Sequence, residues 1–129
     1  MDVMDLRRAL LISQKAEANM ISENDIVHGY AISASGVVSQ NSGAAYVDYI
    51  AVKDRYYTIS AYNPTESWNY RLHGYNAQKQ WIKQINVTNV SAGANYSYTF
   101  KPETGISYIR LSMLNRAENV TMFPTNEPT

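Results

Sequence analysis

Beyond residue 25, apolar and polar side chains alternate along several segments, and this period of two is typical of strands with one buried face. The two clearest examples lie at residues 55–62 and 108–113. One row of each segment is predicted to be buried: Tyr57, Ile59 and Ala61 in the first, Ile109, Leu111 and Met113 in the second. The opposite rows should face outward: Tyr56, Thr58, Ser60 and Tyr62, and Tyr108, Arg110 and Ser112.

Turn-forming Gly, Pro, Asn and Asp residues separate these segments at intervals of roughly ten residues, which is the spacing of an antiparallel β-sandwich. The chain is therefore expected to be all-β. The predicted strands cover residues 28–33, 36–39, 46–52, 55–62, 69–75, 80–86, 95–101, 106–114 and 118–123.

The N-terminal part differs, because residues 2–17 carry helix-favouring residues behind a possible N-cap at Asp2. We expect a short amphipathic α-helix within residues 1–21, ahead of a sandwich domain over residues 22–129. One flank of this helix is apolar and is expected to mediate oligomerisation or docking into a larger assembly, or else to lie on its own domain. The flank consists of Val3, Met4, Leu6, Leu10 and Leu11.

Net charge and composition limit the classes of molecule that the protein is expected to bind. Eleven basic and eleven acidic residues give a net charge of zero, so no field favours nucleic acid or an anionic membrane. No segment is long and apolar enough to insert into a membrane, and no secretory signal is recognisable, which predicts synthesis in a cytoplasm. Eleven tyrosines against two phenylalanines suit half-exposed strands and polar binding surfaces.

The sequence shows no pattern of a catalytic site. His28 and His73 fall in different predicted strands, cysteine is absent, and no nucleophile or phosphate-binding motif is present. The scattered carboxylates are expected to make surface ion pairs. We therefore expect a non-enzymatic protein. These carboxylates are Asp48, Asp54, Glu66, Glu103 and Glu118.

No cofactor is expected. Calcium is a weak option, since residues 23–25 and Asp48 offer oxygen ligands, but the EF-hand pattern is missing and a solvated turn is the ordinary alternative.

The stretch of residues 62–71 offers the most specific candidate site. It places Trp68 at the exit of a Pro-containing loop beside Tyr, Asn and Arg, and aromatic rings with amide and guanidinium groups are what a sugar site uses. Alternatively, Trp68 covers the end of the sandwich. Trp81 is predicted to lie mid-strand, in the core or as a plug on a sheet face, with ligand binding as the alternative. The candidate ligand-binding residues are Tyr62, Asn63, Trp68, Tyr70, Arg71, His73, Tyr108 and Arg110.

The order of several motifs resembles the carbohydrate-binding-module-like jelly-roll domains of tail and baseplate proteins from phages and prophages of Gram-positive bacteria. The start of the chain, residues 4–8, also resembles the leader of short phage tail proteins. The motifs of the resemblance are residues 29–36, 49–52, 56–60, 74–82, 98–102 and 108–112. Such domains often carry Asp where this chain has Asn76 and Pro where it has Ala51.

The resemblance implies a jelly-roll-like antiparallel β-sandwich in a virion tail, made in the cytoplasm of the bacterial host. It would contact a polysaccharide or cell-surface glycan during adsorption and assemble with other tail subunits. The alternative is a structural virion module that joins proteins without binding sugar.

Overall fold

A computed structural model describes residues 19–128, which form eight β-strands after a 3₁₀ turn at Glu23–Asp25. The predicted helix, with Val3, Met4, Leu6, Leu10 and Leu11, lies outside the described residues. The strands are β1 (Ile26–Ile32), β2 (Val38–Ala51), β3 (Tyr57–Asn63), β4 (Trp68–Tyr75), β5 (Trp81–Val90), β6 (Ala94–Phe100), β7 (Tyr108–Leu114) and β8 (Glu118–Pro124).

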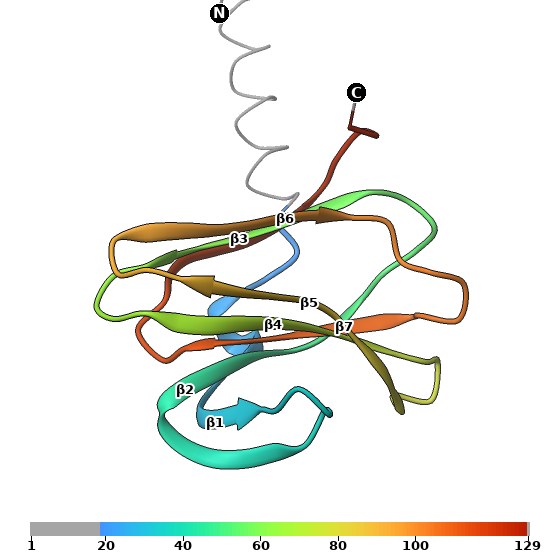
Figure 1. Cartoon of the computed structure of the whole chain (residues 1–129). Coiled ribbons are helices and arrows are strands. Elements are labelled where there is room, and N and C mark those ends of the chain that lie inside the picture. Colours follow the sequence, from blue (N-terminus) through green and yellow to red (C-terminus); the bar gives the residue numbers. More distant parts are fainter. Residues whose placement is uncertain (1–18, 129) are drawn as a thin grey trace, which may run out of the picture.

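The strands form two antiparallel sheets that stack as the layers of a β-sandwich (Figure 1). One sheet has five strands in the order β1-β2-β7-β4-β5, and the other has three in the order β6-β3-β8. The expected all-β sandwich is thus confirmed for the part of the chain that the structure describes.

The core lies between the sheets and is supplied by alternate residues of their strands. Both rows that the sequence assigned to the core are there, because none of their six side chains is more than 3% exposed. Each buried Ile, Leu or Met contributes roughly 1.5 to 3 kcal/mol relative to an exposed position. This burial sets the register of the strands, since a slip by one residue would turn the apolar row outward.

The predicted strands at residues 36–39 and 46–52 are wrong in one respect, because they are parts of one long strand, β2. Residues 40–43 (Gln-Asn-Ser-Gly) have the composition of a turn, but they continue in extended conformation. The pairing with β1 shifts register between His28 and Tyr30, and this irregularity accommodates the polar residues without a reversal.

The loop side of the β1–β2 hairpin curls over the outer face of the five-stranded sheet, below β4 and β7 in Figure 1. The backbone N–H of Ile32 donates to Oγ of Ser112 on β7 at 3.0 Å. Gly36, at φ +83°, lies so close to Trp81 that an added Cβ would be 2.5 Å from the indole. The hairpin therefore adds a partial third layer, and Ser112 is buried although it points away from the core.

The chain joins the sandwich slightly ahead of the expected boundary at residue 22. The backbone N–H of Met20 donates to the carbonyl of Met122 on β8 at 2.8 Å, and Ile21 is only 5% exposed within the core. The polar cluster that follows closes the 3₁₀ turn, since the carboxylate of Asp25 accepts the backbone N–H of Ser22 at 2.8 Å.

Candidate functional site

The two outward rows predicted from the sequence lie on opposite faces of the molecule. Tyr62 belongs to β3 and to the outer face of the three-stranded sheet, whereas Arg71, Tyr108 and Arg110 belong to the outer face of the five-stranded sheet. The two rows therefore cannot line one common face, because β3 and β7 belong to different layers.

Asn63 and Tyr70 are fully buried and cannot contact a ligand at the surface. Nδ2 of Asn63 donates to the carbonyls of Glu66 and Val90 at 2.7 and 2.9 Å, and its Oδ1 accepts the Tyr70 hydroxyl at 3.0 Å. Burial raises the pKa of Tyr70 to about 12, so the hydroxyl keeps its proton and remains a donor. These two candidates tie loops to the core.

His73 is also fully buried, although it lies on the outer side of the five-stranded sheet. Its Nδ1 accepts the indole N–H of Trp81 at 3.0 Å, and within the described chain its Nε2 has no hydrogen-bond partner. Burial, together with the positive charges of Arg71 and Arg110, lowers the pKa of His73 to about 4. The imidazole is therefore neutral at physiological pH and serves to hold Trp81 in place.

Trp68 has features of both alternatives predicted from the sequence, a ligand-binding residue and a cover over the end of the sandwich. It alternates with the buried Tyr70 and Leu72, and its half-buried ring packs partly against the core. A Cβ added to Gly43 of β2 would lie 3.1 Å from Cη2 of Trp68, so the ring reaches across the end of the sheet. Trp68 also borders a groove on the outer face.

This groove, of about 350 Å³, lies between the curled hairpin and strands β4 and β5. Arg71 is the one charged residue among those that line it, and its Nη1 donates to Oε1 of Gln84 at 2.9 Å. Asn69 and Asn89 add side-chain amides, which bond to each other at 2.9 Å. The lining consists of Ala31, Ile32, Ser33, Ser67, Trp68, Asn69, Arg71, Asn89 and Ser112.

Beside the groove, Arg110 of β7 is the centre of an aromatic cluster. Its guanidinium lies 4.8, 4.0 and 5.4 Å from the ring centroids of Tyr46, Tyr49 and Tyr75, and its Nε donates to Asp48 at 3.0 Å. Cation–π contacts of this kind are stronger where water is excluded, and only 12% of the Arg110 side chain is exposed. Arg110 therefore fixes the rings and is itself largely covered.

The more accessible part of this cluster consists of Tyr49, Tyr108 and Lys79. The two rings meet edge to face with centroids 6.0 Å apart, and the Lys79 ammonium lies 5.1 and 5.2 Å from them. Both tyrosines are half-buried and Lys79 is exposed. We call Tyr46, Asp48, Tyr49, Tyr75, Lys79, Tyr108 and Arg110 the tyrosine face.

Four members of the tyrosine face are absent from the candidate residues predicted from the sequence: Tyr46, Tyr49, Tyr75 and Lys79. A register shift between Val47 and Ile50 adds one residue to β2, so that alternation is broken where Asp48 and Tyr49 lie. For Tyr75 the sequence did offer a signal: Leu72 belongs to the buried row, so Tyr75, an odd number of positions further along the strand, is expected on the outward row. Nothing local to Lys79 reveals that its turn places it over the rings.

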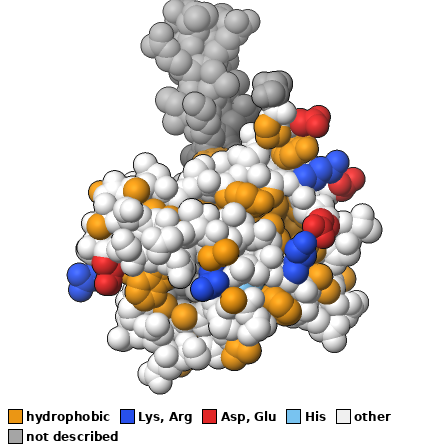
Figure 2. All heavy atoms as spheres, in the orientation of Figure 1, with side chains coloured by type: hydrophobic (Ala, Val, Ile, Leu, Met, Phe, Trp, Pro, Cys, Tyr) orange, Lys and Arg blue, Asp and Glu red, His pale blue; other side chains and the backbone are white. Residues whose placement is uncertain are grey.

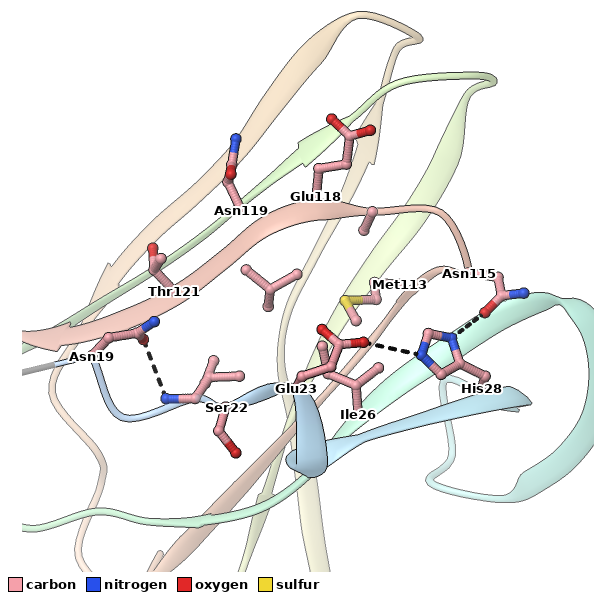
Figure 3. A pocket seen from close by; sticks show the side chains of 13 residues that line it. Asn19, Ser22, Glu23, Ile26, His28, Met113, Asn115, Glu118, Asn119 and Thr121 are labelled. Carbon is pink, nitrogen blue, oxygen red and sulfur yellow. Dashed lines mark hydrogen bonds and ion pairs between the residues drawn. The ribbon is translucent and has the colours of Figure 1, made fainter. Parts of the chain in front are cut away.

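A second hollow, of about 530 Å³, lies near Asn19 between β8 and the beginning of β1, which are edge strands of the two sheets (Figure 3). Glu23 and His28 approach within 3.6 Å there, and His28 also bonds to Asn115. No Tyr, Trp or Phe lines this hollow among the described residues, so it offers no ring for a sugar to stack on. It is a weaker candidate than the groove and the tyrosine face.

Most of the carboxylates noted in the sequence have partners on the protein itself. Asp48 pairs with Arg110, Asp54 with Lys101 at 3.5 Å, and Glu103 with Lys83 at 2.9 Å. Acidic and basic side chains accordingly lie beside one another on the face shown in Figure 2. Between residues 19 and 128, no group of three His, Asp or Glu side chains is arranged to hold a metal ion.

Comparison with known proteins adds no relative. No family model matches the chain, and no curated protein matches it. Within residues 19–128 no helix is both long and apolar enough to cross a bilayer.

Proposed function

We propose that this protein is a non-catalytic carbohydrate-binding domain of a phage tail or baseplate, which binds a host surface or cell-wall glycan during adsorption. The observation that carries the proposal is the outer face of the five-stranded sheet. There, half-exposed rings of the tyrosine face adjoin a groove lined with amide, hydroxyl and guanidinium groups. Trp68, Arg71, Tyr108 and Arg110 remain the sequence-predicted residues of this site.

The chemistry of the face suits a saccharide. A pyranose presents C–H groups that pack on an aromatic ring and hydroxyls that bond to amides and hydroxyls. Arg110 holds the ring of Tyr49, which in turn packs edge to face on Tyr108, so little conformational entropy is lost when these rings bind a ligand. Asn69 and Asn89 offer donors and acceptors at the groove.

The strand order supports a jelly-roll-like path, which the resemblance implies. Eight-stranded jelly rolls pair strands 2-7-4-5 in one sheet and 1-8-3-6 in the other. This chain has both strand orders, except that β1 pairs with β2 instead of with β8. The place beside β8 is taken by the segment at Met20, whose backbone N–H donates to Met122 of β8. Extended glycans suit the open face of such a sheet.

Weak affinity is sufficient if copies act together. A single site with a dissociation constant near 1 mM corresponds to about −4 kcal/mol, and linking sites raises the overall affinity without new contacts. The apolar flank predicted at Val3, Met4, Leu6, Leu10 and Leu11 would supply such linkage as a homo-oligomer. Light scattering of the full chain with Leu6→Glu and Leu10→Glu should then give a smaller mass than the unchanged protein.

A glycan array, followed by cell-wall pull-down, tests the proposal. The intact protein should bind a subset of saccharides, and Tyr108→Ala should weaken that binding roughly tenfold, because ring contacts contribute on the order of 1 kcal/mol each. Asn69→Ala should weaken it less and leave folding intact, since this side chain is exposed.

Tyr62→Ala is the matched control. It removes a half-buried tyrosine of the same type, but from the outer face of the three-stranded sheet. Binding should be unchanged in this variant. Equal loss in Tyr62→Ala and Tyr108→Ala would contradict the placement of the site, and no binding to any saccharide would contradict the function.

The alternative function is a structural virion module, and exposed apolar side chains favour it. Val37, Val38, Trp81 and Ile82 are 38 to 60% exposed where the β1–β2 loop meets the start of β5. A partner subunit would cover them. Under this alternative, Ile82→Asp would abolish assembly with purified tail proteins, while the array would show no sugar binding.

A further inference from the structure

The charges on the candidate face are unbalanced, although the chain as a whole is neutral. Three cations, Arg71, Lys79 and Arg110, share this face with one carboxylate, Asp48. Asp48 and Arg110 neutralise each other at 3.0 Å. Arg71 and Lys79 make no ion pair with any residue of the described chain, so two positive charges remain available to a ligand.

Arg71 is positioned to receive an acidic group. Its hydrogen bond to Gln84 uses Nη1, which leaves further guanidinium N–H groups for a ligand in the groove. No carboxylate lines this groove to compete for them. A partly buried arginine that is already held by a neighbour loses little entropy when it forms the paired hydrogen bonds that a carboxylate or phosphate accepts.

Lys79 stands at the other part of the face. The backbone of Lys79 is in the left-handed conformation, with φ +62°, within the turn after β4. This turn brings the Lys79 side chain over the rings of Tyr49 and Tyr108. Tyr75, which is paired with Tyr108, lies four positions along β4 from Arg71, and four steps of a strand span about 13 Å. The two cations are thus spaced for acidic groups on different units of one chain.

We infer that the outer face of the five-stranded sheet binds an acidic saccharide, in which Arg71 and Lys79 each pair with a carboxylate or phosphate group while the tyrosine rings contact the sugar. This inference rests on the proposed glycan-binding function and names the class of glycan. Neutral hydroxyl-rich sugars would leave both cations without a counter-charge. An acidic peptide would offer the charges without the sugar C–H groups that pack on the rings.

Titration calorimetry of the full chain with four probes tests the inference. The probes are tri-galacturonic acid, the neutral tri-galactose, glucose 6-phosphate and a glutamate tripeptide. Tri-galacturonic acid should bind roughly tenfold tighter than tri-galactose at low salt, and the advantage should shrink as ionic strength rises. Binding of glucose 6-phosphate would identify phosphate as an accepted acidic group, and its absence would restrict the site to carboxylates.

Two variants locate the effect. Arg71→Gln should remove most of the preference for the acidic trisaccharide, and Lys79→Gln should reduce it about threefold, because its side chain is exposed. Arg55→Gln is the charge-matched control. Arg55 is exposed in the β2–β3 connection and lines neither the groove nor the tyrosine face, so the preference should be unchanged.

The possible outcomes distinguish the preference for acidic saccharides from the glycan-binding function on which it rests. Equal binding of both trisaccharides, weakened by Tyr108→Ala, would overturn the acidic preference and leave glycan binding standing. Tight binding of the glutamate tripeptide would also overturn it, because acid would then be recognised without sugar. Failure of all saccharides, here and on the array, would contradict the glycan function itself.

Discussion

The outer faces of the two sheets are built from the same alternating pattern but differ in depth and charge. On the three-stranded sheet, Thr58 bonds to Thr99 at 2.7 Å and Ser60 to Ser97 at 3.3 Å, so neighbouring hydroxyls satisfy one another. On the five-stranded sheet, the curled hairpin creates a groove and buries His73. The period of the strands therefore provides an outward row on each sheet, whereas the irregular β1–β2 hairpin makes only one of these faces a candidate site.

The largest effect is expected for Asn63→Ala, which tests whether this residue is structural. The change leaves the Tyr70 hydroxyl and the carbonyls of Glu66 and Val90 without their buried partner, which should lower the free energy of unfolding by about 3 kcal/mol. Urea unfolding measures this. Asn69→Ala on the exposed face should change it by less than about 0.5 kcal/mol, and equal effects would contradict the assignment.

The next largest effect is a dependence of stability on pH, caused by the buried His73 on the outer side of the five-stranded sheet. The pKa of His73 is about 4 in the folded protein and 6.5 without its surroundings. Below pH 6.5 the unfolded chain binds a proton that the native state refuses, so stability falls between pH 6.5 and 4, by roughly 3 kcal/mol. Below pH 4 this contribution is constant.

Urea unfolding at pH 7 and pH 4 checks this, with His73→Gln as the comparison. The variant should lose much less stability on acidification, because glutamine does not titrate, although carboxylates will lower both curves. The same loss in both proteins would show that His73 is not the titrating group.

A smaller effect compares a covered ion pair with an exposed one. Asp48→Asn removes the counter-charge of Arg110, whose side chain is only 12% exposed, and should cost about 1 to 2 kcal/mol. Asp54→Asn breaks the pair with Lys101, in which Asp54 is 87% exposed, and should cost less than about 0.5 kcal/mol. Thermal unfolding of both variants measures the difference, and equal shifts would remove the special role of Arg110.

The smallest effect is expected on the three-stranded face. Replacing both partners of the Thr58–Thr99 hydrogen bond by valine keeps the shape and removes both polar groups, which is close to neutral for stability. Thermal unfolding of the double variant should shift by less than about 2 °C. A large decrease in the unfolding temperature would show that the hydrogen bond between Thr58 and Thr99 stabilises the fold.

Much of the fold could be predicted from the sequence, because burial on one side of a strand leaves a direct period in the chain. The rows around Ile59 and Leu111 are buried as expected. The error at β2 arose because residues 40–43 have turn composition. They continue in the strand because Gln40 pairs with Tyr30 and Ala45 with His28, so the register shift between these two pairs takes up the intervening residues.

The candidate site was less predictable, because it depends on contacts between distant segments. Asn63 and His73 are polar residues that sequence reasoning places outside, yet each is buried with specific partners. Tyr49 reaches Arg110 through a register shift that no local pattern reveals. Arg71 was a candidate from its position beside Trp68, but its place in the groove and its lack of an acidic partner among the described residues depend on the assembled sheet.

Backbone amide NMR of the full chain, titrated with a soluble digest of Gram-positive cell-wall polysaccharide, would locate the binding face residue by residue. Chemical shift changes should concentrate at Asn69, Arg71, Tyr108 and the Trp68 indole, and the signals of Thr58, Ser60 and Tyr62 should not move. Shifts confined to the three-stranded face, or no shifts at saturating saccharide, would contradict the proposed glycan site.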